Sequence, residues 1–286
     1  MPISLDKINM LTLNVGFAKH NADWNWKKVQ SPFSRIYLVT EGEAYIHLPE
    51  GRFSITPGHL YIIPANTLHD YECHGPFSQY YLHVYEEREY ETSLFSKYNL
   101  PVEVDARPED LLLMQRLCQL FPDLALPESD PQLYNNRKTF LKNMQQMKQH
   151  DIANRIEMRG INTILLSRFM TSAQEKQMMN DERIVSIIDY IHAHIYDDIQ
   201  VSTLADISCL SRGYMTGLFT QKVGMSPQQY INKLKIEKAQ LLLLTDDIQI
   251  KAVAYELGFT DHSYFIRLFK KITGFTPQAY RQMNGI

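Results

Sequence analysis

Apolar and polar residues alternate along the first part of the chain, and further on the pattern changes to a helical period. Between residues 33 and 85, short runs rich in β-branched and aromatic residues are separated by turn signals such as Pro57-Gly58. These runs predict strands at 34–40, 43–48, 52–55, 59–63 and 79–85. Short strands at such regular spacing are typical of an all-β sandwich or barrel.

Helical periodicity begins after Pro101 and predicts helices over 108–121, 132–150, 151–171 and 183–196. The third of these helices is expected to bury one apolar stripe, formed by Ile152, Ile156, Ile161, Ile164, Leu165 and Phe169. Residues 173–181 lack periodic apolar positions and are expected to form a linker. This gives a first domain over 1–172, with a barrel at about 10–85 and helices at 105–172, and a second domain over 182–286.

The second domain contains an internal repeat with an offset of 50 residues. Between Tyr214 and Tyr230, 7 of 17 residues are identical to those 50 positions later. A repeat of this length predicts a duplicated supersecondary unit. The second copy also predicts an amphipathic helix, with Asp261 as its N-cap, Gly274 as its C-terminal cap and Pro277 at the start of the next helix. Its expected buried face is Phe265, Leu268, Phe269 and Ile272.

A shorter helix is predicted before each copy, over 202–209 and 250–259, and a long helix over 226–244 is predicted to join the two units. A helix, a short turn and a second helix can place the second helix in a DNA major groove. The first of these second helices is expected to bury Tyr214, Met215, Leu218 and Phe219 and to present Arg212, Gly213, Thr216, Gly217 and Thr220. The second is expected to present His262, Ser263, Ile266, Arg267, Lys270 and Lys271. The alternative is that these polar strips are only solvated helix faces.

Both units resemble one known family. Its pattern is found in Leu204-Ala205, Ser211-x-x-Tyr214-x-x-x-Leu218-Phe219 and Gly224-x-Ser226-Pro227-x-x-Tyr230, then in Val253-Ala-Tyr-Glu-Leu-Gly-Phe259, Asp261-x-Ser263-Tyr264-Phe265-x-Arg267 and Gly274-x-Thr276-Pro277-x-x-Tyr280-Arg281. This stretch, 201–281, resembles the AraC-type transcription regulators. The resemblance implies a double helix-turn-helix domain that binds promoter DNA through the major groove. It also suggests RNA polymerase as a partner of an activator, although the sequence leaves activation and repression open.

The chain departs from the family pattern at one reading position. Gly217 stands where the family commonly has arginine or another long polar residue, and glycine has no side chain that could reach a base. At the equivalent position the second copy has Arg267, which could make a bidentate contact with guanine, while Ile266 could touch a thymine methyl group. We therefore expect the second unit to carry most of the sequence discrimination.

The N-terminal stretch 57–69 resembles the second motif of cupin barrels, and many AraC-type regulators carry a cupin-like domain that binds a small effector. The expected fold is therefore α+β and multidomain, with an N-terminal β-barrel, flanking helices and an all-α C-terminal domain. Side chains of one parity on a strand face the lumen of a barrel, where an arginine needs a polar partner. The candidate effector pocket is Trp26, Arg35, Tyr37, Tyr45, His69, Tyr81 and His83. The alternative is that Arg35 points outward while Ile36 and Leu38 point inward.

Composition adds limits to this interpretation. Three cysteines far apart in the sequence form neither a disulfide framework nor a metal knuckle, and no apolar run approaches the roughly 18 residues that cross a bilayer. We expect a cytoplasmic protein with no membrane partner. Residues 200–286 hold 10 Lys and Arg against 6 Asp and Glu, while the rest of the chain holds 19 against 26. The basic surplus of the second domain would favour contact with phosphates.

Two alternatives concern the first domain. His47 and His69 could serve a metal centre, but the segment Glu43 to His47 lacks the His-x-His spacing of cupin metal sites. We expect no metal, no cofactor and no enzymatic activity, with a cupin-type metal enzyme bearing a helical tail as one alternative. Another alternative is a DNA-binding dimer that takes no effector. Whether or not an effector binds, we expect a homodimer formed through the helices that follow the barrel.

Overall fold

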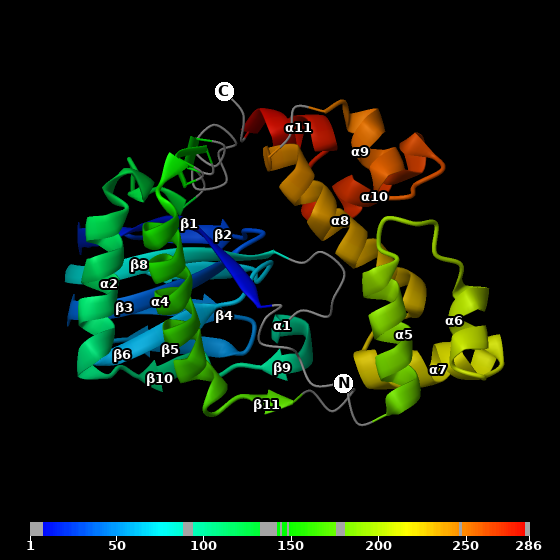
Figure 1. Cartoon of the computed structure of the whole chain (residues 1–286), viewed down its shortest axis with the longest axis horizontal. Coiled ribbons are helices and arrows are strands. Elements are labelled where there is room, and N and C mark those ends of the chain that lie inside the picture. The colour runs from blue at the N-terminus through cyan, green and yellow to red at the C-terminus, as the bar shows by residue number, and fades with distance from the viewer. Residues whose placement is uncertain are drawn as a thin grey trace. The chain divides into compact units, whose positions relative to one another are not determined.

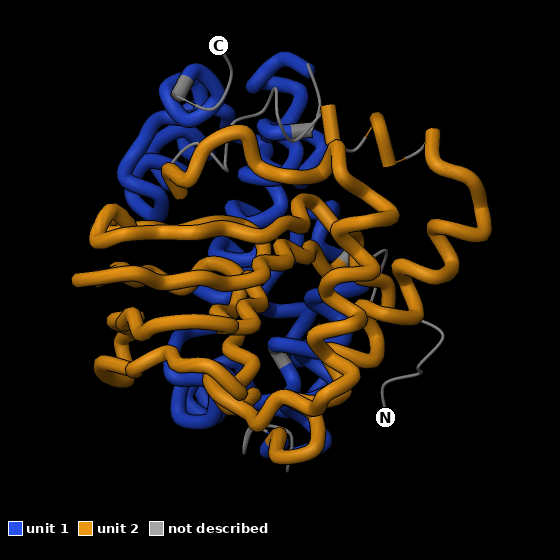
Figure 2. Tube along the Cα trace, turned by 90° about the vertical axis from the view of Figure 1, so that its left-hand side faces the viewer, with its two compact units in different colours: residues 1–3, 88–99, 174–286 blue, residues 4–87, 100–173 orange. Residues whose placement is uncertain are grey.

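The computed structural model describes residues 8–87, 94–131, 142–143, 145–147, 149–175, 181–245 and 248–283. Backbone contacts divide the chain into two compact units, one of residues 4–87 and 100–173 and the other of residues 1–3, 88–99 and 174–286 (Figure 2). The predicted fold class is confirmed, because an antiparallel β-rich domain is followed by an all-helical region. The helix predicted over 132–150 lies largely outside the described residues.

The division between the units differs from the expected domains at one segment. The described residues 94–99 cluster with the C-terminal unit, not with the barrel that surrounds them in sequence. In that unit α1 (Leu94–Lys97) is followed by β9 (Tyr98–Asn99), which pairs with β11 (Gln174–Glu175). Part of the stretch 173–181, which was expected to form a linker, is therefore a short strand.

The strands of the N-terminal unit form two antiparallel sheets (Figure 1). The first has the strand order β1-β8-β3-β6-β10, and the second has the order β2-β7-β4-β5. The strands are β1 (Asn9–Asn21), β2 (Trp26–Val29), β3 (Ser34–Gly42), β4 (Ala44–Leu48), β5 (Gly51–Ile55), β6 (His59–Ile63), β7 (His69–Glu72), β8 (Pro76–Glu87) and β10 (Glu103–Asp105). All five predicted strands are confirmed, as β3, β4, β5, β6 and β8.

The longest strand of the described residues, β1, was not predicted, although Leu11, Leu13, Val15 and Phe17 alternate with small or polar residues. The polar residues Thr12 and Asn14 are also buried, because helices cover this part of the strand. The side-chain amide of Asn162, on α4 (Ile152–Met170), donates to Thr12 Oγ1 at 2.8 Å. The side-chain amide of Asn143, which precedes α4, donates to Leu13 O at 3.0 Å. β1 is therefore held by side-chain amides as well as by its pairing with β8.

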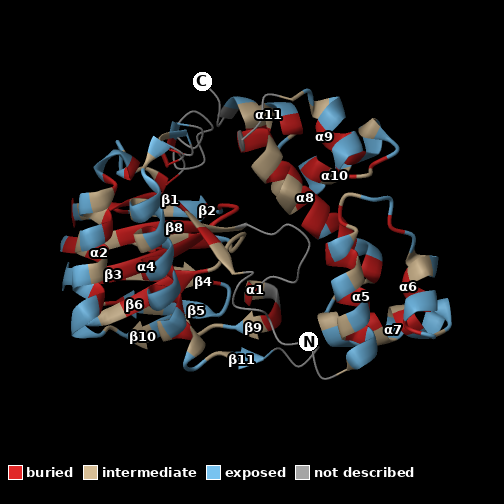
Figure 3. Ribbon diagram, in the orientation of Figure 1, coloured by how far each residue is buried: buried red, intermediate tan, exposed pale blue. Residues whose placement is uncertain are grey.

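The two sheets share one core of inward-facing residues, among them Tyr37, Ile46, Tyr61 and Tyr71. On the outer side of the five-stranded sheet lie α2 (Pro108–Leu120) and α4, with η2 (Pro122–Leu124) after α2 (Figure 1). Figure 3 shows buried residues along the strands and exposed outer surfaces on these two helices. The single stripe predicted for α4 was wrong, because Ile161, Leu165 and Phe169 are buried while Ile152, Ile156 and Ile164 are exposed.

The C-terminal unit is helical and contains two separate small cores, one for each copy of the repeat. The first involves α5 (Glu182–Ala193), α6 (Val201–Ile207) and α7 (Arg212–Val223), and the second involves α9 (Ile250–Glu256), α10 (His262–Thr273) and α11 (Pro277–Met283). The long helix α8 (Pro227–Thr245) runs between the two groups and contributes to both cores (Figure 1). Among the described residues, no helix is both long enough and apolar enough to cross a membrane.

Candidate nucleic-acid interface and barrel site

α7 and α10 are the second helices of two helix-turn-helix units and share the same end geometry. Each begins at a side-chain N-cap, with Ser211 Oγ accepting from Tyr214 N at 3.4 Å and Asp261 Oδ1 accepting from Ser263 N at 2.7 Å. Each ends at a left-handed glycine, Gly224 with φ +80° or Gly274 with φ +83°. The predicted caps of α10, Asp261 and Gly274, are confirmed. Caps can be predicted from sequence because they act within a few residues.

The exposed side of α10 is basic. Ser263, Arg267, Lys270 and Lys271 are exposed, and the Arg267 side chain has an exposed fraction of 68%. Its Nη2 lies 3.8 Å from Asp261 Oδ2, and an exposed pair at that distance holds the guanidinium only weakly. The structure therefore leaves Arg267 accessible to a ligand in solution.

Three positions on α10 differ in exposure from what the sequence suggested, two being less accessible and one more accessible. Ile266 packs partly against the second core, and His262 is half-buried with its Nε2 shielded from solvent. Ile272, which was predicted to be buried, is exposed. A period of 3.6 residues identifies the face of a helix, but the neighbouring helices determine how much of that face they cover.

α7 presents a smaller polar surface. Arg212, Gly213, Gly217 and Thr220 are exposed and Thr216 is half-buried, while the Thr220 hydroxyl donates to Thr216 O within the helix at 2.7 Å. Tyr214 was predicted to be buried, but it is 57% exposed. Of the five positions predicted to contact DNA from α7, Arg212 is the one with a long basic side chain.

Lys235, which was not among the predicted site residues, lies in the middle of α8 and is buried. Its Nζ donates to two backbone carbonyls, Asp197 O and Leu257 O, both at 2.6 Å. Burial lowers the pKa of Lys235 to about 8, although Asp198 and Asp197 act in the opposite direction. The sequence did contain a signal for this burial. Lys235 stands between Leu234 and Ile236, two residues of α8 that belong to the hydrophobic cores.

In the barrel, Arg35 points into the interior, so the outward alternative is wrong. It is 1% exposed, and its Nη2 donates to Ser31 Oγ at 2.7 Å while Nη1 lies 3.5 Å from His69 Nε2. The guanidinium also lies over the Phe33 ring, 5.1 Å from its centroid. A permanent positive charge is therefore held inside the barrel.

A directed chain of hydrogen bonds joins Tyr37, Tyr71 and His69. The His69 Nδ1 lies 2.8 Å from Thr67 O, and since a carbonyl can only accept, Nδ1 carries the proton. In the neutral ring Nε2 is then an acceptor, which takes a hydrogen bond from Tyr71 OH at 2.9 Å, while Tyr37 OH donates to the Tyr71 oxygen at 2.6 Å. Two tyrosines and a histidine are thus fixed around Arg35.

The histidines beside Arg35 are neutral. Burial, and to a smaller extent the Arg35 guanidinium, lowers the pKa of His69 to about 3. The same two causes hold the pKa of His83 well below its usual range, and its ring stacks on Phe33 at 5.1 Å. The barrel therefore combines a fixed arginine charge with neutral imidazoles.

The structure brings most of the predicted pocket together but not all of it. Trp26 packs partly against the barrel core, and Tyr81 is buried with its hydroxyl accepting from Leu126 N at 2.8 Å. Tyr45 was wrongly included, because Ala44, Ile46 and Leu48 face inward on β4 and Tyr45 faces outward. Its ring instead supports the Arg52 guanidinium, which lies 3.5 Å from the ring centroid.

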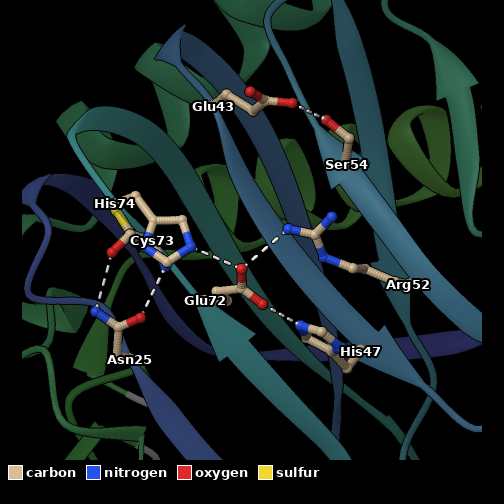
Figure 4. Close-up of polar contacts among 8 residues, drawn as sticks. All are labelled: Asn25, Glu43, His47, Arg52, Ser54, Glu72, Cys73 and His74. Carbon is tan, nitrogen blue, oxygen red and sulfur yellow. Dashed lines mark hydrogen bonds and ion pairs between the residues drawn. The ribbon is translucent and has the colours of Figure 1, made fainter.

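The outer face around Tyr45 carries a polar cluster centred on Glu72 (Figure 4). The carboxylate contacts His47 Nε2 at 2.6 Å, His74 Nε2 at 2.7 Å and Arg52 Nη2 at 2.9 Å. Hydrogen bonds from His74, His47 and Arg52, in that order, lower the pKa of Glu72 to about 2. Within the described ranges, no group of three or more His, Cys, Asp or Glu residues is arranged to hold a metal ion.

Two family models match the chain. A helix-turn-helix domain model matches residues 204–283, and a model of the AraC-like ligand binding domain matches residues 14–121. The chain belongs to the AraC-type family. The order of the two domains, with the ligand-binding model before the helix-turn-helix model, agrees with the architecture described above.

Relatives of this AraC-type chain include bacterial regulators. It is 27% identical over 122 residues to the HTH-type transcriptional regulator YdeC of Bacillus subtilis, covering 43% of this chain and 42% of that protein. It is 32% identical over 111 residues to an HTH-type transcriptional regulator of Staphylococcus aureus, covering 39% of this chain and 15% of that protein. The matches thus span less than half the length of these relatives.

Among solved structures, ToxT from Vibrio cholerae with a bound unsaturated fatty acid matches 96% of both chains, with a TM-score of 0.50 and 16% identity. A second ToxT structure matches 96% of this chain and 98% of its own, with a TM-score of 0.52 and 11% identity. At these identities the likeness shows the fold alone.

Proposed function

We propose that this AraC-type protein is a sequence-specific DNA-binding transcription regulator. The observation that carries the proposal is the exposed basic face of α10, with Arg267 at its centre, on the second helix of a duplicated helix-turn-helix unit. Arginine can form two hydrogen bonds with guanine in the major groove, while Lys270 and Lys271 can contact phosphates. The equivalent position on α7 is Gly217, so the second unit supplies most of the base discrimination.

Substitution of Arg267 separates base reading from phosphate contact. Arg267→Ala is expected to weaken the free energy of binding to the preferred duplex by about 1–3 kcal/mol and to relax the base preference at one or two base pairs. Lys270→Ala is the matched control on the same helix, and it should weaken binding to all duplexes and lower the salt slope by about 1. Selection from random duplexes followed by salt titration measures both effects. A better-specified half-site under α7 would contradict the assignment.

We further propose that the barrel binds a small effector that offers oxygen atoms to Arg35. The support is the enclosed guanidinium together with the fixed donors and acceptors of Tyr37, Tyr71 and His69. A buried arginine favours anionic or multiply hydroxylated ligands, because ligand oxygen atoms stabilise a positive charge that is held away from water. Sugars, organic acids and fatty acids are therefore the classes to screen.

Thermal melting tests the effector proposal. A ligand at 100 times its Kd should stabilise the folded chain by about 2.7 kcal/mol and raise the melting temperature. Arg35→Met should lose this shift, whereas Arg52→Met on the outer face of the barrel should keep it. If no compound of the three classes shifts the wild-type transition, the alternative of a DNA-binding protein without an effector is favoured.

We also propose that the chain forms a homodimer through the exposed side of α4. Ile152 and Ile156 are 66% and 64% exposed, and Ile164 continues the stripe two turns further on, with open space above Gly160 between them. A stripe of this kind on a helix is stabilised by a partner surface, and a second copy supplies it by symmetry.

Light scattering of the full chain tests the dimer. Ile156→Glu should shift the protein from dimer to monomer, because it places a charge in the middle of an apolar contact. Lys27→Glu, at an exposed position on β2, serves as the control and should leave the dimer intact. A wild-type chain that is monomeric both with and without DNA would refute this proposal.

A further inference from the structure

The two helix-turn-helix units have separate hydrophobic cores. The first includes Ile187, Met215 and Phe219, and the second includes Val253, Phe265 and Phe269. α8 contributes to both, and between the units lies a cavity of about 350 Å³ whose lining includes Ile199, Ile231, Asn232 and Phe259. Because packing is interrupted at this cavity, the orientation of one unit relative to the other depends on the contacts that do bridge them.

Lys235 makes such a bridge. From α8, its ammonium donates to Asp197 O in the loop that precedes α6 and to Leu257 O at the end of α9, both at 2.6 Å. These carbonyls belong to different units, since Asp197 follows α5 and Leu257 caps α9. The charge lies 5.2 Å from the Phe259 ring centroid, and the whole residue is only 3% exposed. One buried cation therefore ties together three segments of the domain.

Two other contacts also hold the two helix-turn-helix units together. The Asn232 amide donates to Tyr264 OH at 3.0 Å, which joins α8 to α10. Gly258, next to Leu257, lies against the Tyr196 and Asp197 backbone, where there is no room for a side chain. The loop that follows α5 and the end of α9 thus lie against each other at the point where Lys235 bonds to both.

We propose that Lys235 is a positioning residue for DNA recognition, which fixes α7 and α10 at the separation needed to enter two successive turns of the major groove together. This inference rests on the proposed DNA-binding function. Two modules held rigidly at the correct spacing bind far more tightly than either alone, because the second contact becomes intramolecular. Loosening the connection reduces this gain without removing any side chain that touches DNA.

The test uses the full chain and a duplex selected from a random pool by the wild-type protein. Two further duplexes serve for comparison. In one the half-site bound by α7 is scrambled, and in the other a single base pair is inserted between the half-sites. The variants are Lys235→Met, which keeps most of the stem but no donor, and Lys235→Arg, which keeps two donors. Affinities on all three duplexes are measured at one salt concentration, since salt alone changes them strongly.

Lys235→Met is expected to bind the intact duplex with an affinity about tenfold or more below that of wild type, and the scrambled duplex with an affinity within about twofold of wild type. The inserted base pair should reduce the affinity of Lys235→Met less than it reduces the affinity of wild type. Lys235→Arg should restore both the affinity and the sensitivity to spacing. Unchanged binding by Lys235→Met would overturn the inference. Equal losses on the intact and scrambled duplexes would also overturn it, because they would assign Lys235 a general role in folding. Failure of the wild-type chain to select any duplex would overturn the proposed function as well.

Discussion

Gly258→Ala is expected to destabilise the C-terminal helical unit by about 3 kcal/mol, in two ways. The residue has φ +66°, a left-handed conformation that costs an alanine about 1–2 kcal/mol. In addition, an added Cβ would lie 2.5 Å from Asp197 C and 2.6 Å from Asp197 O, which are backbone atoms that cannot rotate away. Overpacking of that kind costs about 1–3 kcal/mol. Urea denaturation followed by helical circular dichroism measures the sum.

Gly217→Ala is the matched control in the same domain. Gly217 lies inside α7, is exposed, and has no atom within 4 Å of an added Cβ. Alanine is the better helix former by about 1 kcal/mol, so this change should stabilise the protein slightly. Two glycine-to-alanine changes are thus expected to have opposite signs. Equal effects would show that the close approach at Gly258 does not limit stability.

The stability of the barrel is expected to fall as the pH drops from 6.5 towards 3. His69 has a pKa of about 3 in the folded chain against an ordinary value of 6.5, so between these values the unfolded chain binds more protons. The contribution of His69 is complete above pH 6.5 and decreases as the pH falls, and by pH 4 the loss amounts to about 3 kcal/mol. His83, whose pKa is also lowered by burial, adds to the loss with the same sign.

The comparison of wild type with His69→Gln isolates this contribution. Urea denaturation at pH 7, 5 and 4 should show a shallower decline for the variant, because glutamine does not titrate. The buried amide should cost stability at pH 7, so the two curves are expected to converge as the pH falls. Parallel curves would mean that His69 is already accessible to protons in the folded barrel.

The sequence specified the ends of α10 and the strands β3 to β6 because their signals are local. An N-cap bonds to a residue two or three positions away, and a C-terminal glycine relieves strain at its own φ angle. The repeat between Tyr214 and Tyr280 located both reading helices for the same reason. It also indicated the contrast between Gly217 and Arg267, since exposed positions depend little on what packs elsewhere.

The predictions that failed had different causes. The single stripe on α4 was wrong by the helical period itself, because at 3.6 residues per turn Ile161 lies on roughly the opposite side of the helix from Ile152. The side with Ile161 is buried and the side with Ile152 is exposed. The alternation of β4 is clear, but which parity points inward is decided by the opposite sheet, and this excluded Tyr45. Tyr214 lies on the same helix as the buried Met215 and Phe219, yet it is 57% exposed.

By itself the sequence determined the family, the order of a β domain before a double helix-turn-helix domain, and the helix that carries Arg267. The tertiary structure alone placed Arg35 among neutral histidines and placed Lys235 between Asp197 and Leu257. The physical reason is range. Caps, turns and periodicity act over a few residues, whereas the desolvation of a charge and the partners it finds depend on segments that meet only when the chain is folded.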